Sequence, residues 1–122
     1  MTISIHCQTI FNDYNFFKST LDQILDKYPN IQKCLTGRTT PTKFSKRYFL
    51  DKNIVCEQPK LSNLKIQRQY KIVEISDLCI FFYNKNTPSK YNITGKTLVR
   101  ANNLKKEIIV FEYKLLNADN ES

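Results

Sequence analysis

The sequence predicts a single α/β domain with a five-stranded, mainly parallel sheet and helices on both faces. Short apolar segments alternate with amphipathic stretches along the chain, which is typical of parallel sheets built from strand–helix–strand units. The most apolar segment, residues 78–83 (LCIFFY), is hydrophobic at consecutive positions, as expected of a strand covered on both faces. The chain of 122 residues suits one domain, which we place at residues 1–115, with a polar tail at residues 116–122.

Each predicted strand is a short run of apolar, β-branched or aromatic residues that ends at polar or turn-forming residues. The predicted strands are residues 3–7, 31–35, 54–56, 78–83 and 108–113.

Between the strands, apolar side chains recur at helical spacing. In the first such stretch Phe17, Leu21 and Ile24 fall on one face, and Asn12-Asp13 offers an N-cap before them. Pro41 suits the first turn of the second helix. The predicted helices are residues 13–28, 41–49, 66–75 and 90–103.

Composition limits the functional classes. The chain is 41% hydrophobic and 25% charged, close to the average for globular proteins, and no apolar run approaches the roughly 18 residues of a membrane helix. The N-terminus has no signal-peptide pattern, so we expect a cytoplasmic protein without a membrane partner. The net charge of +8 favours an anionic partner, but the basic residues are scattered and form no nucleic-acid stripe.

Cysteine, histidine and carboxylate positions give no catalytic or metal site. The four cysteines are more than twenty residues apart and form no CxxC pair, so we interpret them as reduced core residues. Cys7 is a weak alternative as a nucleophile, because nothing near it in sequence activates it. His6 is interpreted as a structural residue of the first strand, and Asp13 and Asp77 as cap and strand-entry residues. A lone histidine and scattered carboxylates lack the spacing of metal ligands, and no cofactor is predicted.

The predicted ligand site lies beyond the carboxyl ends of the strands, where strand order reverses in sheets of this class. In this chain it involves the loops after Cys7, Leu35 and Tyr83. Arg38, beside Gly37 at a strand-to-helix turn, is the strongest candidate for contact with an anion, because a guanidinium grips phosphate in a forked geometry.

Three stretches carry a family resemblance: IFNDYNFFKSTLDQILDKYPNI, RYFLDKNI and ISDLCIFFYNKNTPSKYNITGKTLVRANNLKKEIIVFEY. Together they resemble the small YspA-like proteins of the SLOG superfamily, from Ile3 to about Tyr113. These are Rossmann-like domains related to the lonely guy phosphoribohydrolases, to DprA and to nucleotide sensors of antiviral defence. The resemblance implies a Rossmann-like domain, a nucleotide-like ligand, and self-association as a homodimer or higher oligomer.

The sequence departs from that family in its phosphate motifs. Cys7, Gln8 and Thr9 stand where the family has Gly-Ser-Arg or Gly-Gly-Arg, and TGRTTPT stands for GGAxGAD. The family's Arg-Asn pair matches Arg68-Gln69, and its second phosphate loop matches residues 83–89. The candidate ligand-binding residues that follow are Gln8, Thr9, Thr36, Gly37, Arg38, Thr39, Thr40, Arg68, Asn84, Ser89 and Lys90. Two glycines in the chain cannot line three turns, so the phosphate cradle is either rebuilt from hydroxyl and guanidinium groups or lost.

The leading hypothesis is non-catalytic binding of a nucleotide-derived, phosphate-containing small molecule, to sense or to sequester it. By analogy it suits an anti-defence protein of a phage or mobile element, which would then act in the host cytoplasm. The first alternative is a scaffold or interaction protein that has lost the ligand site. The second is nucleic-acid binding, suggested by the charge and by DprA. The PGGxGTxxE motif of the phosphoribohydrolases has no counterpart, so we assign no catalytic residue and do not expect that activity.

Overall fold

The structure is a computed structural model that describes residues 1–8, 10–37, 40–59, 64–84, 86 and 93–114. Strands and helices alternate along these residues. In chain order they are β1 (Thr2–Cys7), α1 (Tyr14–Lys27), β2 (Lys33–Thr36), α2 (Thr40–Phe49), β3 (Val55–Glu57), α3 (Lys65–Ile75), β4 (Leu78–Tyr83), α4 (Ile93–Asn103) and β5 (Glu107–Glu112).

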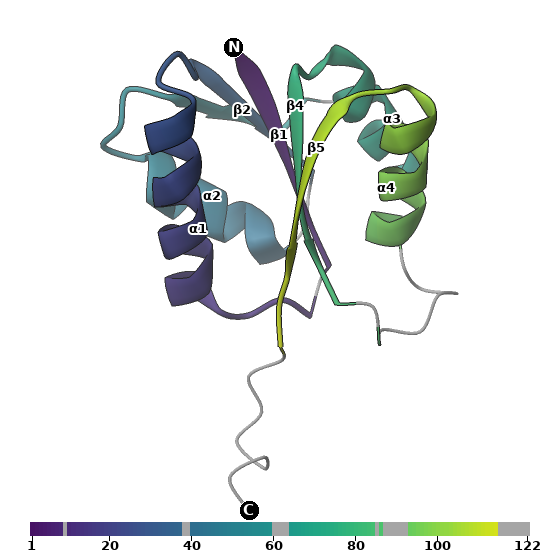
Figure 1. The fold of residues 1–122 in the computed structure, drawn as a ribbon, viewed down its shortest axis with the longest axis horizontal. Helices are drawn as coiled ribbons and strands as arrows, with labels where there is room; N and C mark the ends of the chain where they lie inside the picture. Colours follow the sequence, from purple (N-terminus) through teal and green to yellow (C-terminus); the bar gives the residue numbers. More distant parts are fainter. Residues whose placement is uncertain (9, 38–39, 60–63, 85, 87–92, 115–122) are drawn as a thin grey trace, which may run out of the picture.

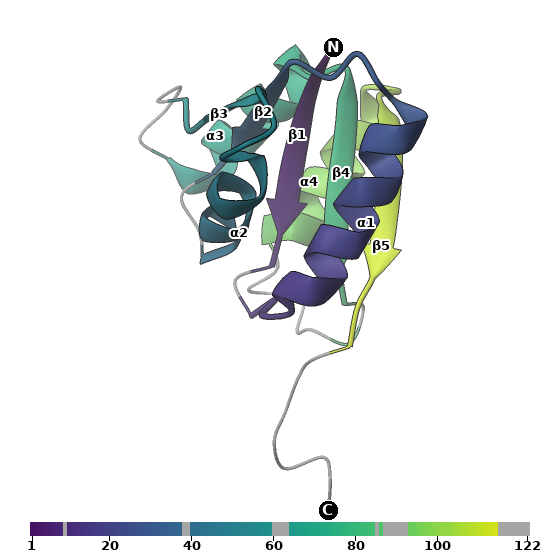
Figure 2. The same ribbon diagram turned by 90° about the vertical axis from the view of Figure 1, so that its left-hand side faces the viewer.

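The five strands form one parallel sheet in the order β3-β2-β1-β4-β5. Helices α1 and α2 cover one face of this sheet, and α3 and α4 cover the other (Figures 1 and 2). This confirms the predicted α/β class, the five strands and the helices on both faces, and the topology is Rossmann-like. The strand order reverses between β1 and β4, so the carboxyl ends of those two strands mark the switch point.

Four of the five strands differ from the prediction at one end or at both. Strand β1 begins one residue earlier, at Thr2, and β3 lies one residue later at each end, at Val55–Glu57. Strand β2 begins at Lys33 and not at residue 31, and it ends one residue later than predicted, at Thr36, because its pairs with β1 run from Thr2–Lys33 to Ile5–Thr36. Strand β5 begins at Glu107 and ends at Glu112, one residue earlier at each end, because it pairs with β4 along its whole length. Both glutamates are exposed on this edge strand, so their charge does not oppose strand formation. The predicted start of the fourth helix, residues 90–92, lies outside the described residues.

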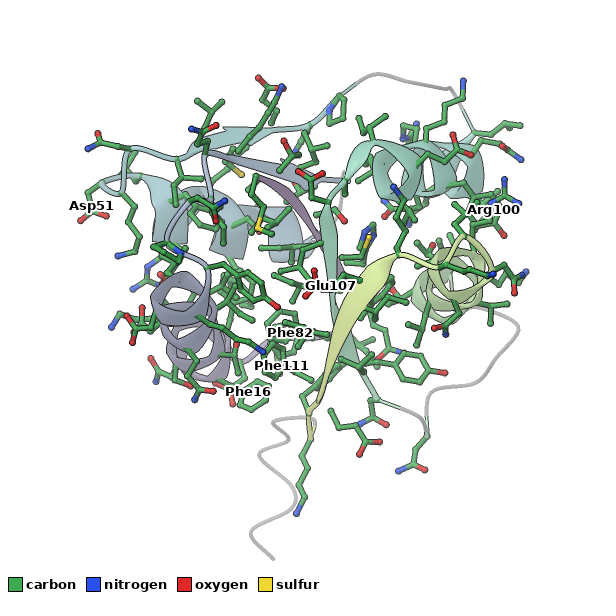
Figure 3. All side chains as sticks on the ribbon, turned by 45° about the horizontal axis from the view of Figure 1, so that its top comes forward. Phe16, Asp51, Phe82, Arg100, Glu107 and Phe111 are labelled. Atoms are coloured by element: carbon green, nitrogen blue, oxygen red, sulfur yellow. The ribbon has the colours of Figure 1, made fainter. Side chains whose placement is uncertain are left out.

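The larger core lies between the sheet and the α1–α2 layer. Its centre is aromatic: the Phe11 and Phe82 rings stack at 5.0 Å, and Phe17 packs 5.2 Å from Phe82. Figure 3 shows Phe16, Phe82 and Phe111 gathered between α1 and β5, and the Phe82–Phe111 centroid distance is 5.4 Å. This packing fixes the carboxyl ends of β4 and β5 against α1.

The core on the α3–α4 face is smaller and more polar. Val73, Cys79, Phe81 and Ala101 form its buried hydrophobic cluster. Alternate residues of β1 face opposite layers, which places Ser4 and His6 among the buried polar residues, away from the larger core. This face therefore contains a buried polar network that leads toward the switch point.

Within the part of the chain that the structure describes, no helix has both the length and the apolar character needed to cross a membrane.

Candidate ligand site at the carboxyl-terminal edge of the sheet

Gln8 directly follows β1, and its side chain links three strand ends. Its Oε1 atom accepts hydrogen bonds from the backbone N–H of Asn84 (2.7 Å) and from the Tyr113 hydroxyl (2.6 Å). Its Nε2 atom donates to the Asn84 carbonyl oxygen (3.3 Å). Asn84 follows β4 and Tyr113 follows β5, so one side chain ties β1, β4 and β5 together where the strand order reverses. We call Gln8, Asn84 and Tyr113 the amide clasp.

The Asn84 side chain extends the amide clasp in two directions. Its Nδ2 atom donates to the Tyr113 carbonyl oxygen (3.1 Å), and its Oδ1 atom accepts from the backbone N–H of Asn86 (2.9 Å). Burial raises the pKa of the Tyr113 hydroxyl, and the neighbouring Cys7 adds to the shift. The hydroxyl therefore stays protonated at neutral pH and remains a donor to Gln8.

A second polar network lies beneath this edge, on the α3 face of the sheet. Gln69 Oε1 can only accept, so His6 Nδ1 carries the proton in their 2.8 Å hydrogen bond. The other ring nitrogen, Nε2, then accepts from the Ser4 hydroxyl at 2.8 Å. The imidazole also stacks on Phe81, with ring centroids 4.7 Å apart. Burial lowers the pKa of His6 to about 4, although its hydrogen bond to Gln69 opposes the shift, and the ring is neutral at pH 7.

Gly37, directly after β2, packs against this network. A Cβ atom built on Gly37 would overlap Nε2 of Gln69 and lie 3.2 Å from its Cδ. The Gln69 side chain thus occupies the space that any larger residue at position 37 needs. Gln69 cannot move aside freely, because its Oε1 atom holds His6.

We expect Gly37→Ala to lower the free energy of unfolding by about 1–3 kcal/mol, because the new methyl group overpacks a buried site. The measurement is chemical denaturation followed by circular dichroism. The cost should shrink when Gly37→Ala is combined with Gln69→Ala, which removes the overlapping side chain. Equal costs in both backgrounds would show that Gln69 is not what requires glycine at this position.

The Thr36 hydroxyl is a buried donor at the end of β2. Thr36 is 3% exposed, and its Oγ1 atom has no oxygen or nitrogen partner among the described residues, although it lies close enough to the Cys56 sulfur to affect that thiol. A buried hydroxyl without such a partner carries a desolvation cost that a polar ligand group would relieve. Thr36 is therefore the described candidate whose hydroxyl lacks an oxygen or nitrogen partner within the described part of the protein.

The structure brings together some of the sequence-predicted residues. Gln8 and Asn84 bond to each other across the switch point, Thr36 ends the neighbouring strand β2, and Gly37 directly follows it. Arg68 is half-buried on α3, next to the Gln69 that contacts His6. Five candidates lie outside the described residues, namely Thr9, Arg38, Thr39, Ser89 and Lys90. Thr40 is the first residue of α2, and its side chain is likewise not described.

Sequence reasoning missed two parts of this arrangement. Tyr113 was predicted only as the last residue of a strand, and its partner Gln8 is 105 positions away. Gln69 was matched to a family pair, with no indication that it would pack under Gly37. His6 was expected to be structural, and the structure shows it buried and bonded at both ring nitrogens. No local pattern signals these contacts, because each joins separate strand–helix units.

The described residues form no metal site, because no three of their His, Cys, Asp or Glu side chains cluster closely enough to hold an ion. Comparison of the chain with protein-family models, curated proteins and solved structures found no match. The resemblance to the SLOG superfamily therefore stays a prediction from the sequence.

Proposed function

We propose that the protein binds a nucleotide-derived, phosphate-containing small molecule at the carboxyl-terminal edge of the sheet and performs no reaction on it. One observation carries the proposal. The ends of β1 and β4 bring Gln8 and Asn84 to the point where the strand order reverses, and Thr36 ends the neighbouring strand β2. Open parallel sheets bind ligands in this position. The net charge of +8 favours an anionic ligand.

The amide clasp decides where such a ligand sits. Gln8 is 5% exposed, and its amide already bonds to Asn84 and Tyr113, so the space between β1 and β4 is filled by the protein itself. The ligand therefore lies over the clasp, toward the end of β2. Thr36 is the last residue of that strand, and we expect Arg38 and Thr39, which follow it in the sequence, to contact the ligand.

Binding without turnover fits the titratable groups near this edge. Burial raises the pKa of the Cys7 thiol well above its usual value, and it raises that of Tyr113 as well. His6, with a pKa of about 4, is buried beneath the edge and bonded at both nitrogens. None of these three groups changes its charge near neutral pH, as a general acid or base must. Such a module serves to sense its ligand or to sequester it.

Isothermal titration calorimetry against cyclic nucleotides and ADP-ribose derivatives tests the proposal. We expect one ligand class to bind with a dissociation constant of tens of micromolar or tighter. Arg38→Ala should weaken that binding by roughly tenfold or more, as expected for the loss of a charged hydrogen bond of about 1.5–3 kcal/mol.

Arg100→Ala is the matched control. Arg100 lies in the last turn of α4, toward the opposite edge of the sheet, where it is 3.4 Å from Glu74 (Figure 3). Its removal takes away the same charge and should leave the affinity unchanged. No binding by any ligand of the panel, or equal losses in the two variants, would contradict the proposal.

The amide clasp also favours a second candidate, a Rossmann-like scaffold whose ligand site is filled by its own side chains. Gln8 occupies the switch point and Gln69 occupies the space beside Gly37. This candidate function predicts that no ligand of the panel binds and that a pull-down recovers a stoichiometric protein partner. Association with nucleic acid would instead weaken steeply as salt is raised.

A further inference from the structure

Cys34 and Cys56 are direct neighbours on adjacent strands. Cys34 lies in β2 and Cys56 in the edge strand β3, and the parallel register pairs their Cα atoms. Neighbouring strands lie about 4.8 Å apart, within the 4.4–6.8 Å between Cα atoms that a disulfide spans. Residues paired in register point to the same face of the sheet, so the two thiols are neighbours, and each affects the pKa of the other. Both thiols are free.

The two cysteines differ in how accessible they are. Cys34 is completely buried in the larger core, whereas Cys56 is only half-buried. Strand β3 has three residues, and the flanking Val55 and Glu57 are exposed. A small oxidant from solvent therefore reaches Cys56 before Cys34, which lies next to it in the core.

The charge around the pair favours a thiolate on Cys56. The neighbouring Cys34 thiol lowers the pKa of the Cys56 thiol, and Lys46 of α2 and the Thr36 hydroxyl lower it further. Partial burial and Glu57 oppose the shift without reversing it. Burial instead raises the pKa of Cys34, Cys7 and Cys79. Reactivity toward oxidants follows thiolate character and exposure, so Cys56 differs from the other three cysteines.

We propose that Cys34 and Cys56 form a thiol redox site, in which a peroxide oxidises Cys56 and Cys34 then closes an intrachain disulfide between β2 and β3. In the first step the Cys56 thiolate attacks the O–O bond of the peroxide. An S–O bond forms, the O–O bond breaks, and hydroxide leaves as water after taking up a proton. In the second step Cys34 sulfur attacks Cys56 sulfur, the S–S bond forms, and the S–O bond breaks to release a second water. Two thiols and one hydrogen peroxide thus give one disulfide and two waters.

This site is independent of the proposed ligand. The disulfide would close a loop from residue 34 to residue 56, which includes α2 and its connection to β2. It would also fasten β3, an edge strand that pairs only with β2 in the described sheet. Oxidation would therefore add a covalent link to the shortest strand of the described sheet, at its edge.

Peptide mapping of the full-length protein tests the proposal without any substitution. Reduced protein at low micromolar concentration is treated with one to a few equivalents of hydrogen peroxide. Remaining thiols are then alkylated, and the protein is digested with trypsin. We expect the intact mass to fall by about 2 Da before alkylation, as two hydrogens are lost. Peptides 34–38 and 53–60 should be joined, and dithiothreitol should separate them.

Two further measurements sharpen the test. A brief maleimide pulse on the native, reduced protein should label Cys56 before Cys79, the matched control on the buried strand β4. Cys56→Ser should abolish the mass loss, and Cys79→Ser should retain it. Failure of the wild-type protein to join peptides 34–38 and 53–60 would overturn the proposal. Stepwise oxygen additions on Cys56 without that link, or a disulfide between two chains, would overturn it equally.

Discussion

Replacing Gln8 with leucine should lower the free energy of unfolding by about 2–4 kcal/mol. The substitution nearly conserves volume but removes the acceptor for the Asn84 N–H and for the Tyr113 hydroxyl. It also removes the donor to the Asn84 carbonyl oxygen. Each buried polar group left without a partner costs about 1–3 kcal/mol, and Asn84 is only partly buried, which limits its share. Urea denaturation at pH 7 gives this free energy.

Two control variants separate the amide clasp from a general effect of glutamine loss. Gln67→Leu makes the same substitution at an exposed residue of α3 and should change the free energy of unfolding by less than about 0.5 kcal/mol. Tyr113→Phe removes only one donor to Gln8 and should cost less than Gln8→Leu. A Gln8→Leu protein as stable as the wild type would mean that the clasp does not hold β1, β4 and β5 together.

Lowering the pH from 6.5 to 4 should cost the protein roughly 3 kcal/mol of stability through His6 alone. The folded-state pKa of His6 is about 4, against 6.5 for the unperturbed group. As the pH falls through 6.5, His6 binds a proton in the unfolded chain but not in the folded protein, so the free energy of unfolding decreases. The stability contribution is fully present above pH 6.5 and is lost as the pH falls toward 4. The cause is burial between Ser4, Gln69 and Phe81, which desolvates the charged ring.

A titration of stability against pH, run beside His6→Gln, isolates this contribution. Both proteins contain the same carboxylates, so the difference between their unfolding free energies cancels the acid titration of other groups. We expect that difference to change between pH 6.5 and 4 and to be constant above pH 7. Parallel curves over the whole range would show that His6 is not buried as a neutral ring.

The elements that were predicted most accurately are those with the strongest local signals. Strand β4 matches its prediction residue for residue, because a run of apolar residues without polar breaks has few alternatives. The Asp13 N-cap of α1 is also confirmed, since its side chain accepts from the Phe16 N–H at 3.0 Å. The limits of β2 and β5 were wrong, because their first and last residues are set by pairing with β1 and β4 and not by local composition.

The sequence predicts only those residues of the candidate site that directly follow a predicted strand. Gln8 and Asn84 follow their strands directly, so the rule about carboxyl ends was enough to select them. The partner Tyr113 and the packing of Gln69 under Gly37 depend on how distant units meet, which no local pattern encodes. The register of Cys34 with Cys56 is of the same kind. These cysteines are far apart along the chain, so their spacing indicates no pair. The parallel register of β2 and β3 places them side by side.

The most direct test of the central claim is a ¹⁵N-resolved NMR titration of the protein with cyclic nucleotides and ADP-ribose derivatives. The proposed site predicts that at least one of these ligands shifts the amide signals of Gln8, Gly37 and Asn84, at the carboxyl-terminal edge. The amides of Asp77 and Lys106, at the opposite edge, should keep their positions and so report that the effect is local. No shift with any ligand at millimolar concentration, or shifts confined to the opposite edge, would contradict a ligand site over the amide clasp.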